Sequence, residues 1–119
     1  MTRFHTFVAV AALGTALAVA APAGAALPKL AGTVGPGFTI TLTQAGKKVT
    51  TLKAGTYSIT VTDKSNIHNF RLKGPGVNKE ITQVGFMGTK TVVVRLKKGK
   101  YTFVCDPHAS IMKGSFTVT

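Results

Sequence analysis

Apolar and polar residues alternate in several short runs along the chain. Every second residue is apolar in 57–61, in 92–96 and in 101–105, and turn residues such as glycine, lysine and asparagine separate these runs from their neighbours. Phe38, Ile40 and Leu42 alternate with threonines in the same way, which predicts a half-buried strand there. Short period-two runs with frequent turns and no helical periodicity are typical of a sandwich of two sheets. The pattern therefore predicts an all-β, antiparallel β-sandwich of seven to eight strands.

Two other segments have weaker patterns. Residues 49–52 predict a weak strand, and 77–84 could hold a short strand or a loop. The lysine- and glycine-rich turn 97–100 predicts a hairpin between the runs on either side of it. Such a hairpin would bring Cys105 and the residues before Thr89 to the same pole of the domain. We therefore expect 85–88 to form part of the wall near Cys105.

The N-terminal segment has the pattern of a secretory signal peptide. Arg3 precedes an apolar run over 7–21, and Pro22 and small residues follow it. A retained membrane anchor is the alternative, but Pro22 ends the run before the roughly 20 apolar residues that a span requires. We predict a signal peptide at 1–26, a linker at 27–36 and one domain at 37–119. The mature chain would then be exported, to the periplasm, the cell envelope or the medium, with no membrane span.

The chain is strongly basic, with 15 Lys and Arg against three Asp and Glu. Such a charge favours anionic partners and predicts that a partner protein has an acidic docking face. Lysines in turns also discourage sheets from associating edge to edge, so part of this charge has a structural explanation. No Arg-rich helix or aromatic interleaving indicates nucleic acid. We expect a monomer that binds no nucleic acid.

The C-terminal region contains a group of soft metal ligands. Cys105, His108 and Met112 lie within eight residues, directly after a predicted strand. Thiolate, imidazole and thioether suit copper, and two His with one Cys and a weak axial Met form the blue-copper arrangement. A buried, unreactive thiol is the simpler interpretation of a single cysteine. The neighbouring His108 and Met112 favour metal binding instead.

His68 can supply the second imidazole. It shares its parity with Phe70 and Leu72, so it faces the apolar side where a strand begins. Outside the predicted signal peptide, His68 and His108 are the only histidines. The predicted copper ligands are therefore His68, Cys105, His108 and Met112. Met87, in the segment expected at the same pole, is a weaker candidate for the axial position.

These motifs resemble those of the cupredoxins, and most of all the plastocyanin, pseudoazurin and amicyanin branch. The resemblance depends on His68-Asn69, on Cys105-Asp106-Pro107-His108 and on Met112-Lys113-Gly114 before a closing strand. It implies a Greek-key sandwich, one type 1 copper ion at one pole and single-electron transfer between redox partners. It also implies that Asn69 ties the two ligand loops together.

Other functions use some of the same residues. A copper carrier of the cell envelope, without a dedicated redox partner, would need the same four ligands. An enzyme could use Cys105 with His108 as nucleophile and base, or a zinc site formed with His68. Met112 would have no role in either enzyme, and no carboxylate is placed by pattern as a general base. A structural module with a buried thiol is the last alternative. We predict an electron carrier and no enzymatic activity.

Overall fold

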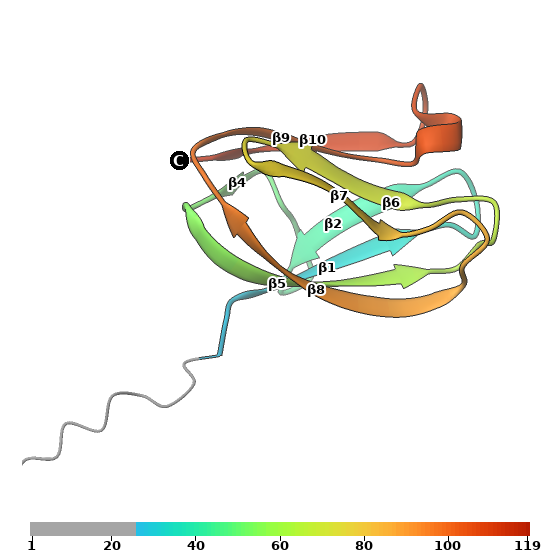
Figure 1. The fold of residues 1–119 in the computed structure, drawn as a ribbon, viewed down its shortest axis with the longest axis horizontal. Coiled ribbons are helices and arrows are strands. Elements are labelled where there is room, and N and C mark those ends of the chain that lie inside the picture. The colour runs from blue at the N-terminus through green and yellow to red at the C-terminus, as the bar shows by residue number, and fades with distance from the viewer. Residues whose placement is uncertain (1–25) are drawn as a thin grey trace, which may run out of the picture.

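The computed structural model describes residues 26–119, which form ten strands and one short 3₁₀ helix (Figure 1). The predicted signal peptide lies outside the described residues except for Ala26. The strands are β1 (Lys29–Val34), β2 (Ile40–Gln44), β3 (Lys47–Lys48), β4 (Thr51–Leu52), β5 (Gly55–Asp63), β6 (Phe70–Gly74), β7 (Val77–Thr82), β8 (Gly88–Leu96), β9 (Gly99–Val104) and β10 (Lys113–Val118). The 3₁₀ helix η1 (Asp106–His108) follows β9. In this part of the chain no helix is long and apolar enough to cross a membrane.

The strands form two five-stranded sheets that pack face to face. One sheet has the order β3-β2-β1-β5-β8 and the other β4-β10-β9-β6-β7. The predicted antiparallel sandwich is confirmed, except that two strand pairs, β1 with β5 and β4 with β10, are parallel. After β1 the chain forms β2 and β3 in the same sheet, crosses to the other sheet in β4, and then returns to the sheet of β1. As a result, β5 starts from the same end as β1 and runs beside it in the same direction.

Segment 27–36 is not a linker, because β1 occupies most of it. Leu30 and Val34 point into the core and are almost completely buried. The glycine in the middle of β1, Gly32, leaves no room for a side chain. A Cβ on Gly32 would lie 2.9 Å from the Phe70 ring and 3.0 Å from the Val61 side chain. The folded domain therefore begins at β1, before the predicted start at residue 37.

Two predicted strands differ from the observed ones. β2 begins at Ile40, and Phe38 is 57% exposed in the preceding loop instead of lying half-buried in the strand. Of the predicted strand at 49–52 only Thr51–Leu52 is a strand, β4. β3 ends just before this segment and belongs to the other sheet, so the chain crosses from one sheet to the other there. The irregular segment 77–84 holds a regular strand, β7.

The core lies between the two sheets and extends to both ends of the sandwich. Phe70 stacks on Phe103, and Tyr101 stacks on Phe116. The Tyr101 hydroxyl donates a hydrogen bond to the Pro75 carbonyl and accepts one from the Lys97 amide, at the end of the sandwich where these strands turn. The aromatic residues thus tie the core to the turns at this end.

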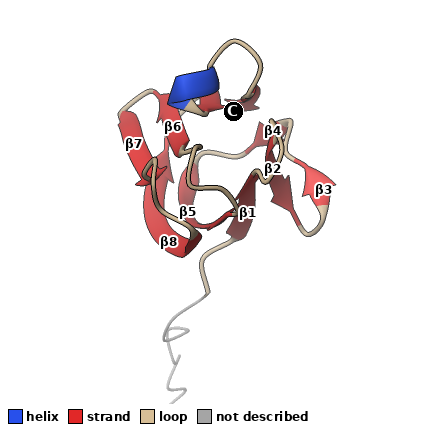
Figure 2. Cartoon of the chain, turned by 90° about the vertical axis from the view of Figure 1, so that its right-hand side faces the viewer, coloured by secondary structure: helices blue, strands red, loops and turns tan. Residues whose placement is uncertain are grey.

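The connections between strands divide between two poles (Figure 1), and Figure 2 looks onto the pole that carries η1. We call one end the site pole; its connections are β1–β2, β5–β6, β7–β8 and β9–β10. We call the other end the turn pole; it holds the β4–β5, β6–β7 and β8–β9 turns and the start of β1. The amide of Gly85 donates a hydrogen bond to the Asn66 carbonyl, so segment 85–88 lies beside the loop that carries His68.

Candidate metal centre

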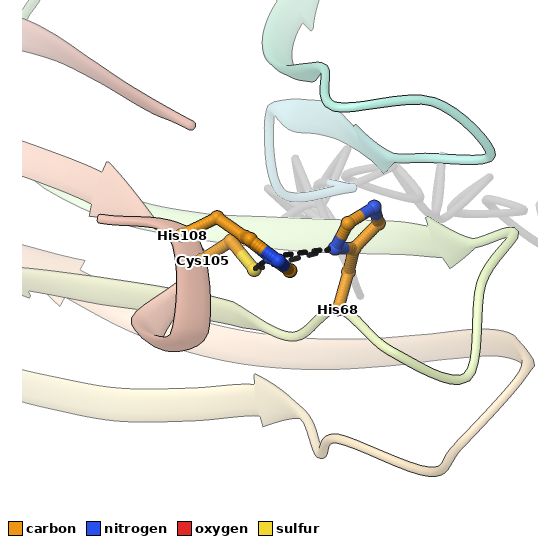
Figure 3. A group of neighbouring side chains, drawn as sticks. All are labelled: His68, Cys105 and His108. Carbon is orange, nitrogen blue, oxygen red and sulfur yellow. Dashed lines mark hydrogen bonds between the residues drawn. The ribbon is translucent and has the colours of Figure 1, made fainter. Parts of the chain in front are cut away.

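Three predicted ligands meet at the site pole (Figure 3). His68 lies in the β5–β6 connection two residues before β6, Cys105 directly follows β9, and His108 ends η1. The Cys105 Sγ lies 3.7 Å from Nδ1 of His68 and 3.6 Å from Nδ1 of His108. The two Nδ1 atoms are 3.1 Å apart. His68 and Cys105 are fully buried, and His108 is partly exposed.

The size of this triangle suits a metal ion. The point equidistant from the three atoms lies about 2 Å from each, close to the roughly 2.0–2.3 Å of metal–nitrogen and metal–thiolate bonds. Two imidazoles and a thiolate in a trigonal arrangement are the donor set of a blue-copper site. The residues that are present therefore fit copper, and they converge on one point from two separate connections.

A hydrogen bond fixes the ring of His68. Its Nε2 lies 2.9 Å from the carbonyl oxygen of Gly37, a contact that requires a proton on Nε2. In the neutral ring, Nδ1 then carries the lone pair and faces the triangle. Such a bond to the second ring nitrogen both orients a ligating histidine and selects its tautomer. The β1–β2 loop thus prepares His68 for metal binding.

The β9–β10 connection is closed by its own backbone. The amides of His108 and Met112 donate hydrogen bonds to the carbonyls of Cys105 and His108, respectively, and the Cys105 amide donates to the Met112 carbonyl. Pro107, at the start of η1, has no amide hydrogen to leave unpaired there. Met112 is fully buried in this loop, whereas Met87 is 59% exposed. Of the two methionines considered for the axial position, burial favours Met112.

Asn69 ties the two ligand loops together, as the resemblance implied. Its side chain is fully buried, and its Oδ1 accepts a 2.7 Å hydrogen bond from the Asp106 amide. Its Nδ2 donates to Oδ2 of Asp106 and to Oε2 of Glu80, both at 2.8 Å. The residue after His68 is therefore bonded directly to the residue after Cys105.

Arg71 extends this connection in a way that sequence patterns did not reveal. Its Nε donates to Oδ2 of Asp106 at 2.8 Å, and its guanidinium lies 3.4 Å from Oε2 of Glu80. Burial would raise the pKa of Asp106, but the hydrogen bonds from Arg71 and Asn69, together with the charges of Arg71 and Lys73, hold it below its ordinary value of 3.8. The hydrogen bond to Asp106 in turn raises the pKa of Arg71.

Phe38 is a second residue of the site that the sequence did not indicate. Its ring centroid lies 5.5 Å from that of His68 and 5.0 Å from that of His108, edge-on in both cases. The side chain therefore covers the two histidines from the solvent side while staying half-exposed itself. Apolar alternation had assigned Phe38 to a strand, and the sequence contains no signal for its contact with the histidines.

The fold and this donor set define a copper-binding β-sandwich. Residues 37–119 match the model of a family described as copper binding proteins, plastocyanin/azurin family. The chain belongs to this family. The resemblance to cupredoxins is thereby confirmed, and copper is the cofactor that the family and the three convergent side chains indicate.

Solved structures of rusticyanin share the fold. Rusticyanin from Thiobacillus ferrooxidans matches with a TM-score of 0.53 and 24% identity, over 76% of each chain. A rusticyanin mutant matches with a TM-score of 0.56 and 22% identity over 76% of each chain, and reduced rusticyanin with 0.53 and 23% over 76% of this chain and 78% of that one. A search of curated protein sequences found no match. The closer likeness to the plastocyanin, pseudoazurin and amicyanin branch stays a prediction.

Proposed function

We propose that this chain is an exported carrier of single electrons that holds one type 1 copper ion through His68, Cys105, His108 and Met112. The observation that carries the proposal is the convergence of a buried cysteine sulfur and two imidazole nitrogens into a triangle of metal-binding size. Bound copper supplies a one-electron couple between its +2 and +1 states. The chain supplies the geometry, and its hydrogen bonds determine how far the ligands can move.

Rigid ligands favour electron transfer over catalysis. His68 is held by Gly37 and packed against Phe38, and the Cys105 loop is held by Asn69. Ligands held in one geometry need little rearrangement when the oxidation state changes, so a small barrier opposes the transfer. The burial of Cys105 also protects the thiolate from oxidation by solvent-borne reagents.

The surface around the centre suits brief docking. Five of the seven large exposed apolar residues described lie in the connections of the site pole: Phe38, Ile67, Val84, Met87 and Ile111. A small apolar patch next to a redox centre permits contact without a permanent complex. The high positive charge of the chain would steer a redox partner with an acidic face toward it, and this attraction weakens as salt rises.

We propose a monomer that is exported after removal of its signal peptide.

Electron self-exchange distinguishes an electron carrier from a copper carrier. The copper-loaded protein is mixed in its oxidised and reduced forms, and the histidine signals of the reduced form are followed by NMR. For an electron carrier we expect line broadening that grows with the concentration of the oxidised form. Sharp lines at every ratio, together with copper transfer to a second chelating protein, would favour copper carriage and overturn the proposal.

A further inference from the structure

Charge is distributed unevenly between the two poles. All three Asp and Glu side chains of the chain lie toward the site pole. Asp63 is buried at the end of β5, and Glu80 and Asp106 are both bound to Arg71. Further basic residues in this part of the molecule are Lys64, Lys73, Lys90 and Lys113, and the charge of Lys73 acts on Asp106. With Arg71, five cations therefore stand against three carboxylates, so the excess of positive charge at the site pole is small.

The turn pole is basic, and no Asp or Glu side chain among residues 26–119 lies there to offset its charge. Five exposed cations lie in or next to the β4–β5 and β8–β9 turns, which are neighbours because Gly55 pairs with Leu96. We call them the turn-pole cluster: Lys53, Arg95, Lys97, Lys98 and Lys100. Among residues 26–119, none of the five forms an ion pair, and Lys29 at the start of β1 adds a sixth cation at this end of the sandwich.

This cluster is too far from the metal centre to serve electron exchange. β8 runs from the site pole to the turn pole over nine residues, which corresponds to about 25–30 Å. A redox partner docked on the cluster would therefore be separated from Cys105 by the length of the sandwich. Its charge needs another explanation.

The composition of the turn pole fits a lipid surface better than a protein. Protein interfaces depend on aromatic and apolar anchors, and five of the seven large exposed apolar residues described are at the opposite pole. Of the other two, Val93 lies along β8, and Leu27 lies just before β1. Clusters of four to eight Lys and Arg are typical of contacts with anionic lipid headgroups.

We propose that the turn-pole cluster binds the surface of an anionic lipid bilayer. In this orientation the β-sandwich stands on the membrane with the site pole pointing away from it. The apolar patch around Phe38 and Ile111 then faces the aqueous phase, where a redox partner can reach it. This membrane contact requires neither electron transfer nor bound copper, because it uses only the charge of the turn pole.

Vesicle sedimentation tests the proposal. The chain from Leu27 contains all ten strands and is used without metal, so the N-terminal apolar run does not contribute. We expect it to sediment with sucrose-loaded vesicles of phosphatidylcholine and phosphatidylglycerol, to stay in solution with phosphatidylcholine alone, and to be released by salt. At about fivefold per lysine, K97Q/K98Q/K100Q should lower the partition coefficient about 100-fold. K97E/K98E/K100E should abolish binding.

The matched control removes three positive charges from the site pole instead of the turn pole. K64Q/K90Q/K113Q should change the partition coefficient less than fivefold, and circular dichroism of each variant checks that it folds. If both triple variants lowered the partition coefficient equally, vesicle binding would depend only on the net charge of the protein, and the proposal would be overturned. No binding to the anionic vesicles would also overturn it. So would tighter binding to soluble polyglutamate than to vesicles, since that outcome indicates an acidic protein partner.

Discussion

The bond between the two ligand loops can be removed by one substitution, Asn69→Ala. The alanine keeps the buried Cβ and deletes three hydrogen bonds. The Asp106 amide loses its acceptor at 2.7 Å, and the carboxylates of Asp106 and Glu80 each lose a donor at 2.8 Å. Water can partly replace the donors on these partly exposed carboxylates. It cannot readily replace Oδ1, because Asn69 is fully buried.

The expected loss of stability follows from these contacts. A neutral hydrogen bond contributes about 1 kcal/mol, and one to a charged group contributes about 1.5–3 kcal/mol. Because Glu80 and Asp106 have side-chain exposures of 29% and 36%, the lower end of the charged range applies to both. We therefore expect Asn69→Ala to lower the free energy of unfolding by about 3–4 kcal/mol.

Urea denaturation of the metal-free protein, followed by circular dichroism, measures this loss without a contribution from copper. Asn66→Ala is the matched control, because Asn66 is exposed and contributes its backbone carbonyl to Gly85. It should change stability by no more than about 0.5 kcal/mol. A loss below about 1 kcal/mol for Asn69→Ala would show that the two loops are held by other contacts, and the reasoning would be refuted.

Three further substitutions test the site. Cys105→Ser should abolish the intense blue colour of the Cu(II) protein, and a variant that stays blue would contradict the ligand assignment. Phe38→Ala should uncover both histidines, so that a chelator removes copper faster than from the wild type, at a stability cost of about 1 kcal/mol because the ring is half-exposed; an unchanged rate would show that Phe38 does not limit access. Because the pKa of Asp106 is lower in the folded chain than in the unfolded one, its contribution to stability is present above about pH 4 and is lost as the pH falls through the folded-state pKa. Urea denaturation of the metal-free protein, repeated from pH 6 to about pH 2, gives the free energy of unfolding at each pH. This free energy should fall less steeply with falling pH for Asp106→Asn than for the wild type, and equal slopes would contradict the ion pair with Arg71.

The sequence predicted those parts of the molecule that depend on local patterns. Alternation in 57–61 and 92–96 identified β5 and β8, because each has one buried face with period two. The parity of His68 with Phe70 placed its side chain inward. The short spacing between Cys105 and His108 placed both on one loop. Only the structure shows how closely His68 approaches these two residues.

Features that depend on contacts between distant residues were missed. β1 resembled a linker because its central Gly32 is small, and the reason for the glycine is the Phe70 ring on another strand. The parallel pairing of β1 with β5 involves segments that alternation cannot relate to each other. Phe38 has the apolar character of a core residue, and only the fold places it over two histidines. The link from Arg71 to Asp106 likewise joins residues 35 positions apart.

Titration of the metal-free chain with Cu(II), followed by visible absorption, tests the central assignment most directly. Coordination of a buried thiolate and two imidazoles predicts an intense blue band that grows in proportion to added copper and stops at one equivalent. A protein that stays colourless, or whose colour continues to rise beyond one equivalent, would show that His68, Cys105 and His108 do not hold a single copper ion together.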